Sequence, residues 1–286
     1  MNLSSPLHLE HRRAALFLLA LLLTASTIHA ESWSRFRGPN GSGVAGGTGY
    51  PAEFGLDKNL LWKSAAAPGK SSPILSARHV FLTAFAGEKL LTQCFDRRTG
   101  KLLWERSVGR ERKANTHRLN EPAAITPVTD GRNVYVFFED WGLLSYDDAG
   151  KLRWKTSLGP FSNAQGLGIS PILADGLLVL QVDQLAGSYI AAFDSSNGET
   201  VWKTEREERD AWSTPVVYRS DGGPAQILTV GDRRMGVHDL KSGKRTFTLP
   251  ALAGAIVASP VLAGNTLYAF GYSLGRPLPF DARPGA

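Results

Sequence analysis

The sequence predicts an all-β protein, a β-propeller made of four-stranded antiparallel blades, with about five blades present in the 286 residues. One observation is a unit that recurs at intervals of about 45 residues, the length of one blade. A second is that this unit contains several short apolar runs separated by tight turns. A third is that a lone sheet of this kind leaves two apolar faces uncovered, so copies must stack around an axis.

The recurring unit has two halves. The first half places a proline between a hydroxyl residue and an aliphatic residue, at Ser72-Pro73-Ile74, Thr126-Pro127-Val128, Ser170-Pro171-Ile172, Thr214-Pro215-Val216 and Ser259-Pro260-Val261. The second half places an aromatic residue four positions after a glycine, at Asp96…Gly100…Trp104, Asp147…Gly150…Trp154, Asp194…Gly198…Trp202 and Asp239…Gly243…Phe247. We expect these aromatic rings to pack against the neighbouring blade, with each indole N–H bonded to a backbone carbonyl.

The second copy indicates the order of the strands within a blade. A short strand at residues 125–129 begins near Pro127, where no ladder donor is needed. Asp130-Gly131 forms a tight turn into an apolar strand at 134–138. A polar corner then leads to strands at 143–146 and 152–157, and the last of these carries Trp154.

Two segments bear on whether the ring closes. Leu60-Leu61-Trp62-Lys63 is typical of an outer strand without a blade of its own, and Trp62 is then a further blade-docking residue. The fifth copy stops after residues 265–271 without its Asp/Gly/aromatic half. Either the early strand closes a five-bladed ring or the ring is incomplete, and we expect the incomplete ring.

The N-terminus has the pattern of a secretory signal peptide. A positive region at 11–13 precedes an apolar stretch at 14–25, which is too short to span a bilayer, and a cleavage site follows Ala30. The predicted organisation is a signal peptide at 1–30, an extended segment at 31–59, the propeller at 60–275 and an irregular tail at 276–286. We therefore expect a periplasmic or secreted protein with no transmembrane segment in the mature chain. The single cysteine, Cys94, has the apolar neighbours of a buried strand residue.

Composition and motifs argue against several function classes. The net charge of +6 is spread along the chain with no basic run, so we expect no nucleic-acid partner. Outside the predicted signal peptide the histidines are His79, His117 and His238, and none has the spacing of a zinc ligand. There is no Gly-x-Ser-x-Gly elbow and no phosphate-binding loop. We predict no catalytic residue and no metal site from these patterns.

Candidate binding residues lie in loops that the repeat brings to one face. Those at the end of the second strand in successive copies are Asp140 and Trp141, Asp183 and Gln184, and Asp232 and Arg233. His117 and Asn120 lie in the longest insertion between copies, and insertions on a rigid scaffold often carry binding. A ring of carboxylates and amides could bind a cation, a sugar or a peptide, although aspartate at a strand end is also ordinary turn chemistry.

These residues resemble the PQQ-like β-propeller repeat proteins, which include quinoprotein dehydrogenases and the propeller lipoprotein of the outer-membrane barrel-assembly machinery. The pattern is clearest at Asp96-Arg-Arg-Thr-Gly-Lys-Leu-Leu-Trp104. Trp33-Ser-Arg-Phe-Arg-Gly-Pro-Asn40 is similar to a box at the mature N-terminus of exported members. The resemblance implies seven or eight blades in a full ring, and for the dehydrogenases it implies PQQ, calcium and an adjacent cysteine pair. A chain with one cysteine cannot form that pair.

Two function hypotheses follow. The first is an exported, non-catalytic scaffold without a cofactor that binds a protein or a polysaccharide of the cell envelope. The alternative is a quinoprotein-like oxidoreductase of the alcohol or sugar dehydrogenase type. It would bind PQQ and Ca²⁺, with Asp140, Asp183 and Asp232 near the site.

Overall fold

A computed structural model describes residues 33–250, 254–271 and 278–281 of the chain. The described residues belong to one compact unit that begins after residue 30. The predicted signal peptide and most of the predicted tail lie outside the described residues. The tail is not irregular throughout, because residues 278–281 form a strand that pairs with residues 266–269. In the described part, no helix has the length and apolar character needed to cross a membrane.

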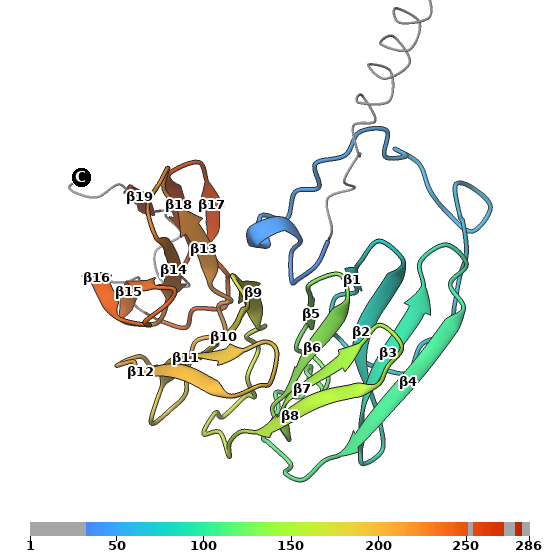
Figure 1. Ribbon diagram of the computed structural model, residues 1–286, viewed down its shortest axis with the longest axis horizontal. Helices are drawn as coiled ribbons and strands as arrows, with labels where there is room; N and C mark the ends of the chain where they lie inside the picture. The colour runs from blue at the N-terminus through green and yellow to red at the C-terminus, as the bar shows by residue number, and fades with distance from the viewer. Residues whose placement is uncertain (1–32, 251–253, 272–277, 282–286) are drawn as a thin grey trace, which may run out of the picture. The chain divides into compact units, whose positions relative to one another are not determined.

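The described unit consists of antiparallel sheets in which consecutive strands are neighbours (Figure 1). Four blades have four strands and the fifth has three, and the described sheets do not close into a ring. The predicted all-β propeller with an incomplete ring is therefore confirmed. The strands of the first two blades are β1 (Ile74–Leu75), β2 (His79–Ala86), β3 (Lys89–Asp96), β4 (Leu102–Gly109), β5 (Val128–Thr129), β6 (Asn133–Phe138), β7 (Gly142–Asp147) and β8 (Leu152–Ser157). Those of the other blades are β9 (Ile172–Ala174), β10 (Leu177–Val182), β11 (Tyr189–Asp194), β12 (Thr200–Glu205), β13 (Val216–Arg219), β14 (Ala225–Val230), β15 (Arg234–Asp239), β16 (Arg245–Pro250), β17 (Val261–Ala263), β18 (Thr266–Ala269) and β19 (Leu278–Asp281).

The turn between the third and fourth strands is what the Asp-x-x-x-Gly pattern encodes. In the first blade, Asp96 Oδ1 accepts hydrogen bonds from the backbone N–H groups of Arg98 and Thr99, at 3.1 and 2.7 Å. Gly100 then closes the turn by donating to the Asp96 carbonyl at 2.8 Å, with φ of 71°. Glycine adopts this left-handed conformation without steric cost, because it has no Cβ.

The same glycine receives the tryptophan ring of the preceding blade. The Trp154 indole lies against Gly198, where an added Cβ would come within 2.4 Å of the ring. Trp154 Nε1 donates to the Ser195 carbonyl at 2.9 Å. The equivalent contacts are Trp104 with Gly150 and the Asp148 carbonyl, and Trp202 with Gly243 and the Leu240 carbonyl. Phe247, at the matching position of the fourth blade, is 49% exposed.

Residues 60–63, which the sequence predicts to be an outer strand, pair with no strand in the described part of the chain. Trp62 nevertheless packs on the first blade in the way that Trp104, Trp154 and Trp202 each pack on the blade that follows their own. Its Nε1 donates to the Arg97 carbonyl at 2.9 Å, and its ring covers Gly100. The segment therefore occupies the place of a preceding blade's outer strand without a ladder.

The Ser/Thr-Pro half of the unit links the blades near their innermost strands. Each proline directly precedes one of β1, β5, β9, β13 and β17. From the second copy on, each hydroxyl accepts a hydrogen bond from the backbone N–H of the equivalent residue in the preceding blade. The bonds are Ser72 to Thr126 at 3.0 Å, Thr126 to Ser170 at 3.2 Å, Ser170 to Thr214 at 3.0 Å and Thr214 to Ser259 at 2.9 Å.

The N-terminal box, residues 33–40, crosses several blades (Figure 1). The carbonyls of Trp33 and Ser34 accept hydrogen bonds from β1 and β5, at 2.8 and 2.9 Å. Arg35 donates to the Pro215 carbonyl at 2.7 Å, and burial lowers the pKa of its guanidinium to about 10. Asn40, at the short 3₁₀ turn η1 (Pro39–Gly41), exchanges two hydrogen bonds with the backbone of Val217 on β13.

The core lies between neighbouring blades. Between the second and third, Tyr135, Phe137 and Trp154 pack with Leu180 and Val182. Cys94 on β3 is fully buried, as its context predicts, and burial raises the pKa of its thiol to about 12.

Candidate functional site

The candidate residues lie at the edge of the blades where each second strand ends and each third strand begins, which we call the loop edge. Asp183 is the first residue after β10, whereas Asp140 and Asp232 are the second residues after β6 and β14, so all three lie at the same corner of successive blades. The connector after each outer strand also starts at this edge, because the outer strand runs antiparallel to the third strand.

Asp140 is buried and held by the connector that leaves the first blade. Arg110 Nε donates to its Oδ2 at 2.6 Å, and the Ala114 backbone N–H donates to its Oδ1 at 2.7 Å. Both carboxylate oxygens therefore have internal partners.

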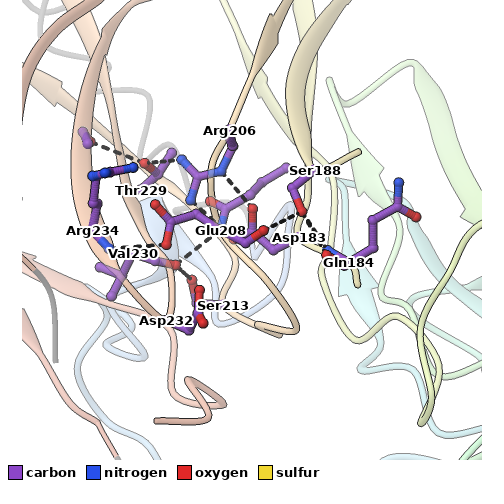
Figure 2. A network of polar contacts seen from close by, with 12 residues as sticks. Asp183, Gln184, Ser188, Arg206, Glu208, Ser213, Thr229, Val230, Asp232 and Arg234 are labelled. Atoms are coloured by element: carbon purple, nitrogen blue, oxygen red, sulfur yellow. Dashed lines mark hydrogen bonds and ion pairs between the residues drawn. The ribbon is translucent and has the colours of Figure 1, made fainter. Parts of the chain in front are cut away.

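Asp183 is fully buried and forms a two-pronged ion pair with Arg206 (Figure 2). Arg206 Nε lies 2.6 Å from Oδ1, and Nη2 lies 3.1 Å from Oδ2. Arg206 also donates to Thr229 Oγ1 at 2.7 Å, and the Gln181 amide donates to Asp183 Oδ2 at 2.7 Å. Burial raises the pKa of Asp183, and the guanidinium and amide contacts act in the opposite direction.

Asp232 and Glu208 belong to the same polar network (Figure 2), and the backbone of Arg233 joins it through Glu208. Asp232 Oδ1 accepts from the Arg209 backbone N–H at 2.8 Å. Glu208 Oε2 accepts from the backbone N–H groups of Arg233 and Arg234, at 2.8 and 3.1 Å. The Arg233 guanidinium is 55% exposed and lies 3.9 Å from Asp232. The network ties the end of β12 to the corner between β14 and β15.

The carboxylates of Asp140 and Asp183 are engaged within the protein. Both oxygens of Asp140 and of Asp183 are already bonded to arginine, amide or backbone donors. Among the described residues, no three His, Cys, Asp or Glu side chains form a group that could hold a metal ion. A calcium ion bound through Asp140 or Asp183 would compete with these internal ion pairs.

The other candidates have varied surroundings. The Trp141 ring is buried in the cluster that contains Phe138 and Leu144. Gln184 is buried, and its Oε1 accepts from the Ser162 backbone N–H at 2.9 Å. His117 is exposed and its backbone N–H donates to the Gln165 carbonyl at 3.0 Å. The insertion that carries His117 and Asn120 thus lies beside the connector between the second and third blades.

A pocket of about 450 Å³ lies between these two connectors, and sequence reasoning missed it. Its polar side chains include Arg112, Glu139 and Asn163, and its apolar wall includes Phe161 and Leu185. Glu139 and Asn163 are each 6% exposed. Glu139 directly precedes Asp140, and the only sequence signal for it is a second carboxylate at the polar corner. Asn163 lies in a connector without periodicity.

The pKa of Glu139 is raised to about 7, first because the carboxylate is buried and further because Asp140 is adjacent. The Leu167 backbone N–H donates to Glu139 Oε2 at 2.8 Å, and this hydrogen bond acts to lower the pKa. The pocket therefore contains a carboxyl group whose pKa lies near neutrality, and Arg112 lines the same pocket.

Comparison with known proteins places these features in a family. The family model described as outer membrane protein assembly factor BamB matches residues 88–286. The curated BamB proteins of Bordetella pertussis and Burkholderia pseudomallei are 26% identical over 165 residues and 27% identical over 191 residues. These matches cover 54% and 65% of this chain but 37% and 45% of the relatives. The chain thus spans less than half the length of the curated relatives that it matches.

Solved structures share the fold. BamB from Moraxella catarrhalis superposes with a TM-score of 0.50 at 17% identity, covering 75% of this chain and 61% of that protein. A quinohemoprotein alcohol dehydrogenase from Comamonas testosteroni gives 0.57 at 13% identity, covering 90% of this chain and 50% of that protein. At these identities the likeness concerns the fold alone. The same fold occurs in an assembly factor and in a dehydrogenase, so it does not decide the function.

Proposed function

This chain belongs to the family of the outer membrane protein assembly factor BamB, and from that premise we propose that it is a non-catalytic scaffold without a cofactor. Its loop edge binds protein partners in the cell envelope, on the periplasmic side. The name of its relatives supports a role in the assembly of outer-membrane proteins.

The observation that carries the proposal is the state of the loop-edge carboxylates. Asp140 and Asp183 are held in internal ion pairs, which order the corners and engage both of these carboxylates. The same edge and its connectors present exposed apolar side chains, such as Leu119 at 63% and Leu185 at 46% exposure. A rigid corner with exposed apolar groups suits recognition of a protein surface better than chemistry on a small substrate.

Photo-crosslinking in the producing cell tests the proposal. A photoreactive amino acid is placed at Leu119 or Leu185, and at Leu152 or Val201 as controls. The control residues are similarly exposed, but they lie on outer strands near the opposite edge. We expect covalent adducts with envelope proteins from the first pair and few from the second.

Two results would contradict the proposal. One is equal labelling from all four positions. The other is dye reduction with an alcohol or sugar after PQQ and Ca²⁺ are added to the purified protein, which would favour the oxidoreductase alternative. For the proposed scaffold we expect no dye reduction and no quenching of tryptophan fluorescence by PQQ.

A further inference from the structure

The interface between the second and third blades shows which side chains two successive blades bring together. The second blade contributes Tyr135 on β6 and Phe137, two residues further along the same strand. The third blade contributes Leu178 and Leu180 on β10 and Phe193 on β11. All five side chains are almost fully buried in one cluster. A blade therefore meets the next one with two side chains on one face of its second strand.

The first blade carries the same receiving set as the third. Its members are Val80 and Leu82 on β2 and Phe95 on β3. Val80 pairs with Phe95 in the register in which the third blade pairs its own leucine and phenylalanine. The three side chains line an apolar pocket of about 560 Å³, and Leu82 is only half-buried, whereas its counterpart Leu180 is fully buried. No blade precedes the first one in the described part of the chain, so no sheet covers this face.

Residues 61–66 form one wall of this pocket. Trp62 covers Gly100, and the Ser64 hydroxyl donates to the Gly100 carbonyl. Because alternate residues of an extended segment share a face, Trp62, Ser64 and Ala66 line the pocket together. No backbone group of residues 61–66 is hydrogen-bonded to another described residue. The segment therefore lies on the first blade like an outer strand whose backbone is free to pair with a further strand.

The fifth blade exposes the counterparts of Tyr135 and Phe137. Tyr268 pairs with Val261 across β17 and β18 in the register that Tyr135 has with β5, and Phe270 follows two residues later. Tyr268 and Phe270 are 39% and 44% exposed. In the described structure β19 pairs with β18 alone, so its other edge is open. The fifth blade thus presents an aromatic pair and a strand edge, and the first blade presents the pocket and the strand that would receive them.

We propose that the fifth blade of one copy of this chain docks on the first blade of a second copy. Tyr268 and Phe270 of one copy enter the apolar pocket of the other, and residues 61–66 of that other copy pair along the open edge of β19. The contact repeats between two chains the interface that the second and third blades form within one. It uses sheet faces and not the loop edge, so it is independent of the proposed binding of envelope proteins.

Closure of one chain on itself would bring the same groups together, but at a cost in existing contacts. Successive blades are fixed to each other by the hydrogen bonds of their Ser/Thr-Pro residues, and the N-terminal box ties the first two blades to the fourth. Bending the row of blades into a closed ring would strain these bonds. Association of two copies leaves them unchanged.

Sedimentation velocity of the purified protein over a range of concentrations tests the proposal. The two docking faces differ, so each dimer keeps one free face of each kind and association can continue. We expect the average mass to exceed that of one chain and to rise with concentration. Tyr268→Asp and Leu82→Asp each bury a charge in the contact and should weaken association roughly tenfold or more. Val201→Asp on β12, where Val201 is 49% exposed, is the control and should associate as the unaltered protein does.

A mixture of the two variants gives the sharpest result. Tyr268→Asp retains the pocket and Leu82→Asp retains the aromatic pair, so the mixture has one intact pair of faces. We expect it to form dimers with one chain of each variant and nothing larger, which also shows that both variants fold.

Three results would overturn the proposal: a mass of one chain at every concentration, as ring closure within one chain would give; dimers formed by either variant alone, as contact between like faces would give; and a mixture that stays monomeric while the unaltered protein associates. Crosslinking from Leu119 should be the same in Tyr268→Asp as in the unaltered protein, so the failure of either proposal would leave the other standing.

Discussion

Glu139 and Asp140 are neighbours in the chain, but their side chains have different environments. Asp140 faces Arg110 and forms a buried ion pair, whereas Glu139 has a single backbone donor and a pKa raised to about 7. The sequence predicts a polar corner here and selects Asp140 from its position in the repeat. It cannot distinguish the two side chains, because their directions depend on the connectors that cover them.

The raised pKa of Glu139 predicts a loss of stability as the pH rises. The unfolded chain releases this proton near pH 4.5 and the folded protein only near pH 7, so the folded state is favoured below this window. Between pH 4.5 and 7 the free energy of unfolding should fall by up to roughly 3 kcal/mol from this residue.

Glu139→Gln should remove this dependence. Urea unfolding from pH 4.5 to 8 should show the variant gaining stability relative to the unaltered protein as the pH rises. Glu199→Gln, which alters an exposed carboxylate in a turn, is the control. A constant difference between Glu139→Gln and the unaltered protein over this range would contradict the prediction.

At the scale of elements, the sequence predicts much of the strand pattern. The apolar run at 134–138 is β6 less its first residue, and the predicted strand at 152–157 coincides with β8. These strands are predictable because apolar runs and tight turns are local signals. Residues 60–63 have the composition of a strand but no ladder, because a ladder requires a partner strand that local sequence cannot reveal.

The contact between tryptophan and glycine predicts how much the free energy of unfolding falls when a methyl group is added to the glycine. Gly198 and Gly176 have nearly equal φ angles of 77° and 78°. A Cβ at Gly198 would meet Trp154 at 2.4 Å, whereas at Gly176 it would have no neighbour within 4 Å. Gly176→Ala should therefore cost about 1–2 kcal/mol from the backbone alone.

Gly198→Ala should cost a further 1–3 kcal/mol, roughly, because the indole must move out of its contact with the third blade. The comparison is made by urea unfolding, with tryptophan fluorescence as the probe. Equal costs for the two substitutions would show that the ring yields freely, and that this contact does not hold the blades together.

At the scale of the molecule, the blades are joined by three kinds of contact, two of which recur along the chain. Indole rings cover glycines, hydroxyls accept from the preceding blade, and the N-terminal box crosses from the first blades to the fourth. The sequence predicts the first kind from residue type and spacing. The second and third depend on the placement of segments far apart in the chain, as with Ser34 and Thr129.

The N-terminal box therefore predicts a coupling between the start of the chain and the fourth blade. Asn40 Nδ2 donates to the Val217 carbonyl at 2.7 Å, and the Val217 N–H donates back to Asn40 Oδ1 at 2.9 Å. Asn40→Ala removes both bonds and should lower the free energy of unfolding by about 1–3 kcal/mol. Hydrogen exchange at the Val217 amide should also become faster.

Asn59→Ala is the matched control, because the Asn59 amide donates only to the exposed Glu53 carbonyl, at 2.7 Å. Asn59 and Asn40 both have positive φ, 58° and 44°, so each alanine variant carries a backbone cost of about 1 kcal/mol. Asn59→Ala should show this cost alone and leave the exchange of β13 unchanged. If Asn40→Ala behaved like Asn59→Ala, the box would be a passive covering of the inner strands. A selective increase of exchange in β13, with β6 and β10 unaffected, would instead show that the N-terminal box stabilises the fourth blade. This blade lies far from the N-terminus in sequence and is bound to it through Asn40 and Arg35.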